Sequence, residues 1–555
     1  MRPFENIYLW AIVSLSMFCG CKKGDGKTDD TGNVHSFSVR SLTVGGQSDP
    51  AFFKGLELEP QIQILFSAPL DKNTFSSSIS LADKEGKTVN FTASLGKDDS
   101  LLVVQPVSLN PLSSYTFHIF TTLSSVNSHL SQAVEISFST GIDSTSKFPD
   151  ISDEDLLNLV QKQTFKYFWD LGHPVSGMAR ERDSSGEVVT TGGTGFGVMA
   201  IVTAIHRGFI TREEGLARVQ QILTFLKNKA QRFHGAFPHW LNGTTGAVQP
   251  FSSKDNGADL VETSFLMEGL LTARQYFNGS ASAEAVLRND INDLWQSVEW
   301  SWFRKNNEDV LYWHWSPDYN WDMNMQVKGW NEALITYVLG ASSPTYPIPK
   351  SVYDGGWAGN GSVKNGASYF GITLPFGPAN GGPLFFAHYS FLGLNPSGLS
   401  DAYGNYQAQN EAHSRINYLY CQANVKNFYG YSSECWGLTA SDDIEGYLAH
   451  SPDNDDGVIS PTAALSSLPY TPEESMRALK FFYYKLGDRI WGEYGFKDAF
   501  SLDNPWVANS YLAIDQGPII AMIENYRSHL LWNLFMSCQE VKSGLKKLGF
   551  SGPNI

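Results

Sequence analysis

Charged side chains are scarce in this 555-residue chain. Asp, Glu, Lys and Arg make up 17% of it, against about 25% in an average soluble domain. Together with 42% hydrophobic and 13% aromatic residues, this scarcity excludes a disordered, collagen-like or coiled-coil chain. Basic residues are fewer than acidic ones: the chain has 40 Lys and Arg and 56 Asp and Glu, which gives a net charge of −16. That charge repels phosphate backbones and anionic lipids, so we expect a neutral ligand and no nucleic-acid partner.

Cysteine is also scarce. Two of the five cysteines lie at positions 19 and 21, and Cys421, Cys435 and Cys538 remain. An odd number cannot all pair within the chain. Cys421 and Cys435 could form a disulfide in an oxidising compartment, although buried free thiols are the commoner outcome. Their spacing matches no metal motif, and we expect neither a metal nor a cofactor.

Residues 1–21 resemble a bacterial lipoprotein signal peptide. Arg2 stands near the start, residues 7–18 are apolar, and a glycine precedes Cys21, the predicted lipidation site. The apolar stretch is too short to span a bilayer. A phenylalanine replaces the usual leucine of the lipobox, and an ordinary cleaved signal peptide is the alternative. Residues 22–34 are predicted to be a polar linker. We therefore expect an exported, monomeric lipoprotein, outer-membrane or periplasmic, that touches the membrane only through its anchor.

Residues 35–142 alternate in short apolar runs, such as Ile62, Ile64 and Phe66, separated by turn residues about every ten positions. This pattern predicts an antiparallel β-sandwich. The stretch 60–71 resembles bacterial Ig-like domains found in front of secreted enzymes. No cluster of acids or histidines marks a site there, so we interpret the domain as a spacer, with carbohydrate binding as the alternative.

Residues 148–555 follow a helical period instead. Ser152 with Asp155, and Thr211 with Glu214, are typical helix starts. Other helices are predicted to run from 472 to Gly487 and from Pro518 through Leu530 to Phe535. Long Gly-rich and aromatic connections separate the helices, at 171–193, 233–258, 307–328, 342–384 and 430–458. Connections of that length are usually functional. Paired helices with such loops on one rim indicate a mainly α domain, an (α/α) toroid that encloses a cleft.

Several of these loops mix aromatic rings with polar side chains, which suits sugars. The apolar face of a pyranose packs on an aromatic ring while polar side chains hydrogen-bond its hydroxyls. Aromatic residues at helix ends are more often core, but their recurrence in five loops favours a sugar cleft. The predicted substrate contacts in them are Phe237, His239, Trp240, Trp313, His314, Trp330, Asn331, Glu332, His388 and Trp436.

Glycoside hydrolysis needs a carboxylic acid to protonate the leaving oxygen and usually a carboxylate to activate water. Many acids lie in the loop mouths: Glu181, Asp255, Asp259, Glu262, Glu332, Glu434, Asp442, Asp443, Asp453, Asp455, Asp456, Glu493, Asp498 and Asp515. Glu262 begins a nearly apolar helix, where a low dielectric would keep it protonated. A capping box with Asp259 explains the same spacing, and spacing alone leaves both possibilities open.

Other acidic positions have equally plain alternatives. Asp515, beside Gln516, is either a helix N-cap or a contact to a sugar hydroxyl. Arg180 and Arg182 either bind substrate or hold Glu181 in a salt bridge. The acidic run 453–456 lacks the spacing and the final Glu of a calcium loop, so a solvated turn is favoured.

A set of motifs in order resembles glycoside hydrolase family 144, the glucoamylase-like endo-β-1,2-glucanase family. They are 167–170 (YFWD), 176–182 (SGMARER), 192–197 (GGTGFG), 259–263 (DLVET) and 513–518 (AIDQGP). The resemblance implies an (α/α)6 toroid that cleaves β-1,2-glucan with inversion and without metal. It places the catalytic acid at Glu262, and we favour Asp443 or Asp442 over Glu434 as the base.

Three rival functions remain at this point. An α-glucan hydrolase fits the glucoamylase-like name. A non-catalytic glycan-binding surface lipoprotein would also be helical, aromatic and tethered, but it would not need a buried protonated Glu. A polysaccharide lyase using His388 and Tyr389 would require basic residues around a uronate, and the net charge of −16 argues against it.

Overall fold

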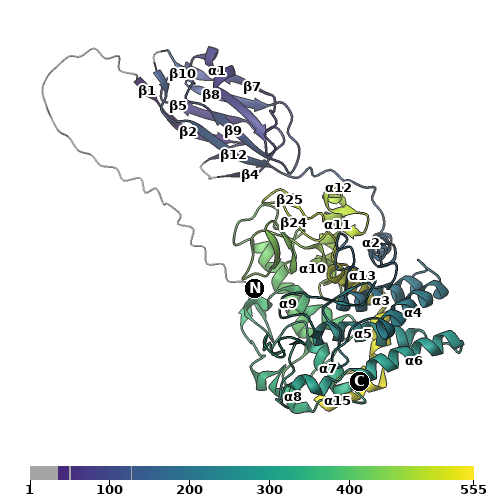
Figure 1. Cartoon of the computed structure of the whole chain (residues 1–555). Helices are drawn as coiled ribbons and strands as arrows, with labels where there is room; N and C mark the ends of the chain where they lie inside the picture. Colours follow the sequence, from purple (N-terminus) through teal and green to yellow (C-terminus); the bar gives the residue numbers. More distant parts are fainter. Residues whose placement is uncertain (1–34, 49–51, 127) are drawn as a thin grey trace. The chain divides into compact units, whose positions relative to one another are not determined.

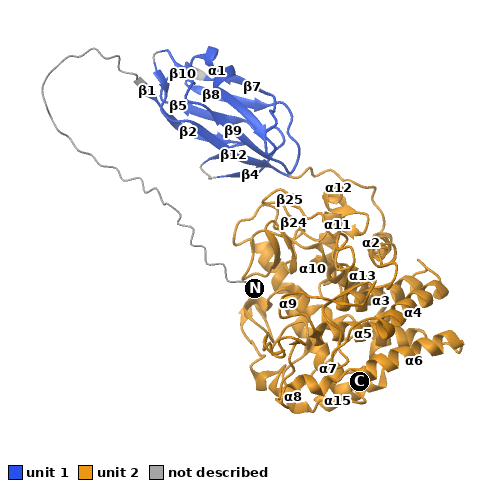
Figure 2. Ribbon diagram, viewed as in Figure 1, with its two compact units in different colours: residues 1–141 blue, residues 142–555 orange. Residues whose placement is uncertain are grey.

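The computed structural model describes residues 35–48, 52–126 and 128–555. The chain divides into two compact units, Met1–Gly141 and Ile142–Ile555, and each unit has its own hydrophobic core (Figure 2). The predicted signal peptide, the lipidation site Cys21 and the linker 22–34 lie outside the described residues. Within the described ranges, no helix combines the length and the apolar composition needed to cross a bilayer.

The first unit is a β-sandwich (Figure 1). One sheet has the strand order β3-β2-β5-β8-β7 and the other β4-β12-β9-β6, with a small third sheet β1-β11-β10. Burial alternates along the central strands, as the sequence pattern predicts. The strands are β1 (His35–Phe37), β2 (Val39–Val44), β3 (Gln47–Ser48), β4 (Phe53–Leu56), β5 (Ile62–Phe66), β6 (Ile79–Asp83), β7 (Phe91–Leu95), β8 (Leu101–Pro106), β9 (Ser114–Ile119), β10 (Ser124–Ser125), β11 (Ser128–Leu130) and β12 (Val134–Thr140).

The helices of the second unit, labelled in Figure 1, alternate along the chain between two patterns of burial. Five are buried almost all round: α3 (Thr191–His206), α5 (Leu260–Tyr276), α7 (Leu334–Ser342), α10 (Pro461–Leu465) and α13 (Ala513–Ser528). Helices buried on one side lie between them in sequence: α2 (Asp153–Trp169), α4 (Arg212–Asn228), α6 (Ser282–Ser297), α9 (Tyr406–Ala423) and α11 (Pro472–Tyr484). Helices that are apolar all round form the interior of a domain, so the first set lies inside and the second outside.

Shorter helical elements complete the second unit. They are α8 (Lys350–Gly355), two 3-10 turns at Leu384–Ala387 and Tyr389–Phe391, α12 (Gly487–Ile490), α14 (Leu530–Met536) and α15 (Gln539–Leu548).

Two glycines let α3 and α5 pack with their backbones in contact. A Cβ added to Gly195 would lie 2.1 Å from the carbonyl oxygen of Phe265, and one added to Gly269 would lie 2.1 Å from that of Gly195. Neither position can accept a side chain without moving a helix. This contact brings the first turn of α3 beside the first turn of α5.

Helix starts agree with the sequence better than helix ends. Ser152 caps α2, and Thr211 with Glu214 forms the predicted capping box of α4. The helix expected to end at Gly487 stops at Tyr484, and Gly487 begins α12.

The helix expected to begin at Pro518 begins at Ala513 instead, so Pro518 lies inside it, where a proline removes one intrahelical hydrogen bond. It also ends earlier than expected. His529, with φ of 60°, separates it from α14.

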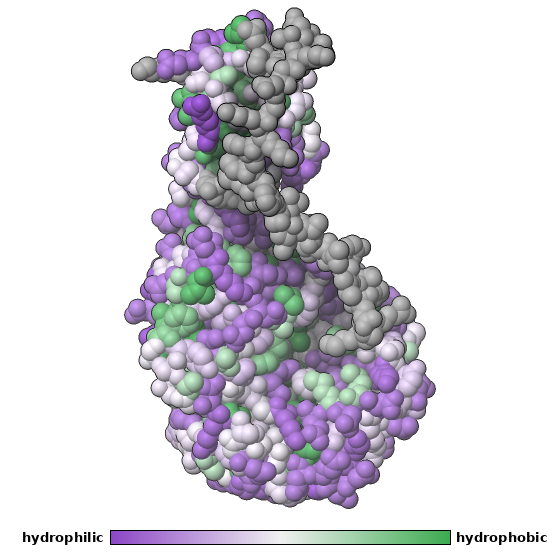
Figure 3. All heavy atoms as spheres, turned by 90° about the vertical axis from the view of Figure 1, so that its left-hand side faces the viewer, coloured by the Kyte–Doolittle hydropathy of each residue, from purple (hydrophilic) through white to green (hydrophobic). Residues whose placement is uncertain are grey.

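The three cysteines of this unit are buried free thiols, so Cys421 and Cys435 are not bonded. On the face shown in Figure 3, hydrophilic side chains predominate and hydrophobic ones form small scattered groups.

Short strands tie the long connections together. β16 (Ala258–Asp259) pairs with β17 (His314–Trp315), which sets Asp259 opposite His314. The hairpin of β20 (Ala440–Asp443) and β21 (Gly446–Ala449) projects from the connection after α9. The others are β13 (Val188–Thr190), β14 (Trp240–Asn242), β15 (Val248–Gln249), β18 (Ser368–Tyr369), β19 (Ile372–Thr373), β22 (Trp491–Gly492), β23 (Gly495–Phe496), β24 (Phe500–Ser501) and β25 (Trp506–Val507).

Candidate active site

Glu262 lies in the first turn of α5 and does not take part in capping it. Asp259 is the N-cap, and its Oδ1 accepts the N–H groups of Val261 and Glu262 at 3.0 and 2.9 Å. The N–H of Asp259 donates to the carbonyl of Phe237, so it is not available to Glu262. Oε2 of Glu262 instead accepts the N–H of Gly192 in α3, at 2.8 Å. The capping-box interpretation of this spacing is therefore wrong.

Gly192 is shaped for that contact. A Cβ at this position would lie 2.5 Å from Oε2 of Glu262 and 3.0 Å from the ring of Phe265. A side chain there would push the carboxyl group out of its place. The N–H that Gly192 donates is one of the amide groups that a helix start leaves without an intrahelical partner.

Two histidines from different loops surround Asp259. Nδ1 of His239 lies 3.0 Å from Oδ2 of Asp259, and its Nε2 lies 3.9 Å from Oε1 of Glu262. Nε2 of His314 lies 3.5 Å from Oδ2 of Asp259 and 3.4 Å from Oδ2 of Asp255. Although burial opposes it, these histidines hold the pKa of Asp259 well below its ordinary value. Asp259 is thus a buried carboxylate that stays negatively charged.

The environment of Glu262 favours its protonated form. Burial, together with the carboxylates of Asp259 and Asp255, raises its pKa to about 7, while His239 and the N–H of Gly192 act in the opposite direction. Burial also raises the pKa of nearby Glu332 to about 7. A carboxyl group with such a pKa can donate a proton near neutral pH. We call Glu262, Asp259, Asp255, His239, His314 and Glu332 the α5 group.

A second set of carboxyl groups comes from three distant loops. Asp498 accepts the N–H of Asp442 at 2.6 Å and shares a hydrogen bond with Asp515. Arg182 pairs with both oxygens of Asp442, at 3.1 and 3.2 Å, and with Glu181. Burial raises the pKa of Asp498 to about 7, and burial and the Asp498 carboxylate raise that of Asp515. We call Asp442, Asp498, Asp515, Arg182 and Glu181 the Asp442 group.

Tyr389 connects the two groups. Burial raises its pKa, and the charges that add to the effect are those of Asp515, Glu332 and Glu262. Charges of both groups thus act on Tyr389. Tyr447, on β21, also raises the pKa of Tyr389. The charges of Asp515, Asp498 and Asp442 in turn raise the pKa of Tyr447, whose side chain is 51% exposed. A Cβ on Gly193, beside Gly192, would lie 2.7 Å from the Cβ of Ala513, at the start of the helix that carries Asp515. Because these two helix starts are in contact, we treat the two groups as one site.

The predicted sugar contacts that belong to neither group divide into two classes. Trp240 and Trp313 are partly exposed near the α5 group. The ring centroids of Trp240 and the exposed Phe251 are 4.9 Å apart. The others are buried in the core or hydrogen-bonded within the protein. Phe237 and Trp330 are core residues. The hydrogen-bonded ones are His388 (to Ser467), Trp436 (to Glu474), Gln516 (to Phe496), Arg180 (to Leu171) and Asn331 (to Ala333). Apart from the partly exposed Asn331, these side chains pack the interior because the long connections are themselves folded.

Asp443 does not join either group. It follows Asp442 in β20, and successive side chains of a strand point to opposite faces. Its carboxylate lies with His450 and Asp456 instead. The sequence does not distinguish Asp255 and Asp498 from the other acids in the loops. It also does not predict a place in the site for Tyr447, or for Ser510, whose hydroxyl donates to Asp442. No local pattern marks them, since their partners are distant in the chain.

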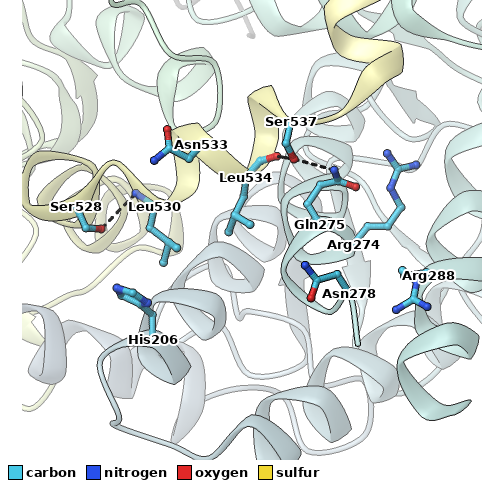
Figure 4. Close-up of a pocket in the computed structure, with 10 residues that line it drawn as sticks. All are labelled: His206, Arg274, Gln275, Asn278, Arg288, Ser528, Leu530, Asn533, Leu534 and Ser537. Carbon is cyan, nitrogen blue, oxygen red and sulfur yellow. Dashed lines mark hydrogen bonds between the residues drawn. The ribbon is translucent and has the colours of Figure 1, made fainter. Parts of the chain in front are cut away.

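A cavity of about 420 Å³ lies at the other end of α5 (Figure 4). Arg274, in the last turn of α5, lines it, whereas Glu262 is in the first turn. Its arginines already have partners, because Arg274 pairs with Glu540 and Arg288 donates to the carbonyls of Phe277 and Gly279. It has no part in the site described above.

Comparison with known proteins gives the following matches. A family model described as "Putative glucoamylase" matches residues 324–539, and one for a bacterial Ig-like domain matches residues 43–140. An exo β-1,2-glucooligosaccharide sophorohydrolase (non-reducing end) from Parabacteroides distasonis is 48% identical over 427 residues, 73% of this chain. The chain spans 59% of the length of that relative.

Solved structures match over their whole length. A crystal structure of a "putative glucoamylase" from Bacteroides uniformis is 56% identical with a TM-score of 0.73, and covers 74% of this chain and 100% of its own. An endo-β-1,2-glucanase from Chitinophaga pinensis, solved with sophorotriose and glucose, is 53% identical with a TM-score of 0.72. The match covers 73% of this chain and 100% of the glucanase chain. The chain therefore belongs to glycoside hydrolase family 144, with a bacterial Ig-like domain preceding its helical unit.

Proposed function

We propose that this protein is a glycoside hydrolase that cleaves β-1,2-glucan, with Glu262 as its acid. The observation that carries the proposal is the position of the Glu262 carboxyl group, which is turned away from its own helix start and toward Gly192 and His239. A group whose pKa is about 7 can give its proton to a glycosidic oxygen near neutral pH. The relatives named for action on β-1,2-linked substrates support the choice of glucan.

The reaction needs a second carboxylate, and we propose Asp442 for it. Glu262 protonates the glycosidic oxygen as the C–O bond breaks, and water attacks the anomeric carbon from the opposite face, giving its proton to the base. Asp442 faces the site and is oriented by Arg182. Asp443, the other candidate from the sequence, faces His450 and Asp456 instead. Trp240, Trp313 and Tyr447 would contact the sugar rings.

We further propose that the helices form the (α/α)6 toroid. The alternation of outer and inner helices supports it: α2 and α3, α4 and α5, α6 and α7, then α9 and α10, α11 and α13. The remaining pair would be α8 with the buried 3-10 turns at Leu384–Ala387 and Tyr389–Phe391. Such a ring would gather the site residues of several connections on one rim.

A substrate panel tests the function. The protein is incubated with β-1,2-glucan, with a β-1,3-glucan and with amylose, and new reducing ends are measured. We expect reducing ends from β-1,2-glucan alone, and ¹H NMR of the first products should show the α-anomer, as inversion requires. Cleavage of amylose alone would favour the glucoamylase-like alternative. Binding of β-1,2-glucan without any product would favour a glycan-binding protein.

The predicted export signal remains a proposal, as does the monomeric state. We propose that Cys21 carries a lipid that tethers the protein to the outer membrane or within the periplasm. Palmitate labelling and membrane fractionation of the wild type and of Cys21→Ala test it. Label and membrane association should both disappear in the variant, and a variant that keeps them would contradict the anchor. Light scattering of the soluble form should give the mass of one chain.

A further inference from the structure

A second cluster of chemically active side chains lies beside the β20–β21 hairpin. Asp443 ends β20, while His450 and Asp456 come from the segment that follows β21. One ligand atom from each of the three side chains lies within 4.8 Å of the other two. Nδ1 of His450 is 3.2 Å from Oδ1 of Asp456. The cluster belongs to neither group of the active site.

His450 is the unusual member. Its side chain is fully buried, and neither ring nitrogen makes a hydrogen bond of normal geometry. Buried polar atoms almost always have a partner, because leaving one without a partner costs about 1–3 kcal/mol. Among the described residues, no Lys or Arg pairs with Asp443 or Asp456. The imidazole is thus directed at two carboxylates that lack a cation.

We propose that Asp443, His450 and Asp456 bind a divalent transition-metal cation such as Zn²⁺ or Mn²⁺. One imidazole nitrogen and two carboxylate oxygens suit these ions, whereas Ca²⁺ prefers oxygen ligands alone. Asp456 is 43% exposed, so water can complete the coordination from outside. The proposal departs from the metal-free expectation of the sequence and stands apart from the proposed function.

The position of the cluster suggests what the ion would do. Asp443 adjoins Asp442, and the hairpin also carries the exposed Tyr447. An ion joining Asp443 to His450 and Asp456 would tie the hairpin to the turn at 451–457. Asp455 of that turn is already fixed from the other side by Tyr420 and Tyr431. The ion would therefore hold in place the hairpin that carries Asp442.

Isothermal titration tests the site on the whole protein after dialysis against EDTA. ZnCl₂, MnCl₂ and CaCl₂ are titrated separately into the wild type and three variants. We expect one Zn²⁺ or Mn²⁺ per chain in the wild type, and at least tenfold weaker binding in Asp456→Asn and in Asp443→Asn. Asp453→Asn is the matched control, because Asp453 is an exposed residue of the same turn and accepts a hydrogen bond from Asn380, outside the cluster.

A second readout guards against nonspecific binding. Chymotrypsin cleavage after the exposed Tyr447 should be slowed by Zn²⁺ in the wild type and in Asp453→Asn, but not in Asp456→Asn. Circular dichroism verifies that each variant is folded. Absence of a one-to-one site in the wild type, or equal affinity in Asp456→Asn and Asp453→Asn, would overturn the proposal and leave His450 as a buried partner of Asp456 alone.

Discussion

The proton affinity of Glu262 results from opposing neighbours. Burial and two carboxylates raise its pKa to about 7, and His239 lowers it. Because the acid must be protonated to act, kcat should fall as the pH rises through about 7. Replacing His239 by Gln removes the lowering effect, so this limb of the pH profile should move to higher pH. The measurement is the rate of reducing-end release against pH.

His234→Gln is the control for this profile. His234 pairs with Glu299 rather than with Glu262, so its loss should leave the limb in place. If the limb of His239→Gln stayed in place or moved to lower pH, the assignment of this pKa to Glu262 would be wrong.

Gly192 should matter for activity more than for stability. In Gly192→Ala the new methyl group would lie 2.5 Å from Oε2 of Glu262, so the carboxyl group has to turn away. We expect kcat to fall at least tenfold, since the acid loses its position, while the melting temperature changes by only a few degrees. A variant with wild-type kcat would show that the contact between Gly192 and Glu262 is dispensable.

Spacing alone could not decide the role of Glu262. The interval from Asp259 to Glu262 fits both a capping box and a catalytic acid, and only the long-range hydrogen bonds to Gly192 and from Asp259 to Phe237 separate the two. The apolar run after Glu262 did predict its burial correctly, because a helix that is apolar all round must lie inside.

At the scale of elements, the contact between α3 and α5 positions the acid beside its donor. Gly195→Ala would place a methyl group 2.1 Å from the carbonyl oxygen of Phe265, so the helices must separate. We expect a loss of about 1–3 kcal/mol or more in the free energy of unfolding. Urea denaturation measures it, with Gly552→Ala, whose nearest neighbour is 3.2 Å away, as the control. Equal stability of the two variants would contradict the close packing.

Local chemistry predicted helix starts but not every boundary. The hydroxyl and carboxylate pairs at Ser152 and Thr211 are local signals, and both caps form as expected. The extension of α13 before Pro518 depends on burial of its first turn, which no local pattern shows. The same reason explains why Trp436 and His388, although they lie in polar aromatic loops, are core residues.

At the scale of the whole molecule, the two units have separate cores. Relatives that cover only 73–74% of this chain are nevertheless complete structures. Residues 142–555 alone should therefore fold cooperatively and keep kcat/KM on soluble β-1,2-glucan within about twofold of the full chain. Thermal unfolding and initial rates of both proteins measure this. A fragment that is folded but inactive would assign the β-sandwich a part in catalysis rather than that of a spacer.

The second half of the site could not be predicted from the sequence. Asp442, Asp498 and Asp515 come from separate connections, and they meet only because the chain closes on itself. The order of the two units and the helical class follow from periodicity, whereas the Asp442 group depends on contacts between residues far apart in the chain. The preference for Asp442 over Asp443 likewise rests on the strand that places them on opposite faces.

The most direct test of the central claim compares two substrates on Glu262→Gln. Cleavage of β-1,2-glucan needs a proton on the leaving oxygen, whereas β-sophorosyl fluoride has a leaving group that needs little help. We predict that the variant loses about 10² to 10⁴ in kcat on the glucan and stays within tenfold of wild type on the fluoride. Glu268→Gln, at a buried carboxyl group of the same helix, controls for structure. Equal losses on both substrates, or none on the glucan, would contradict Glu262 as the acid.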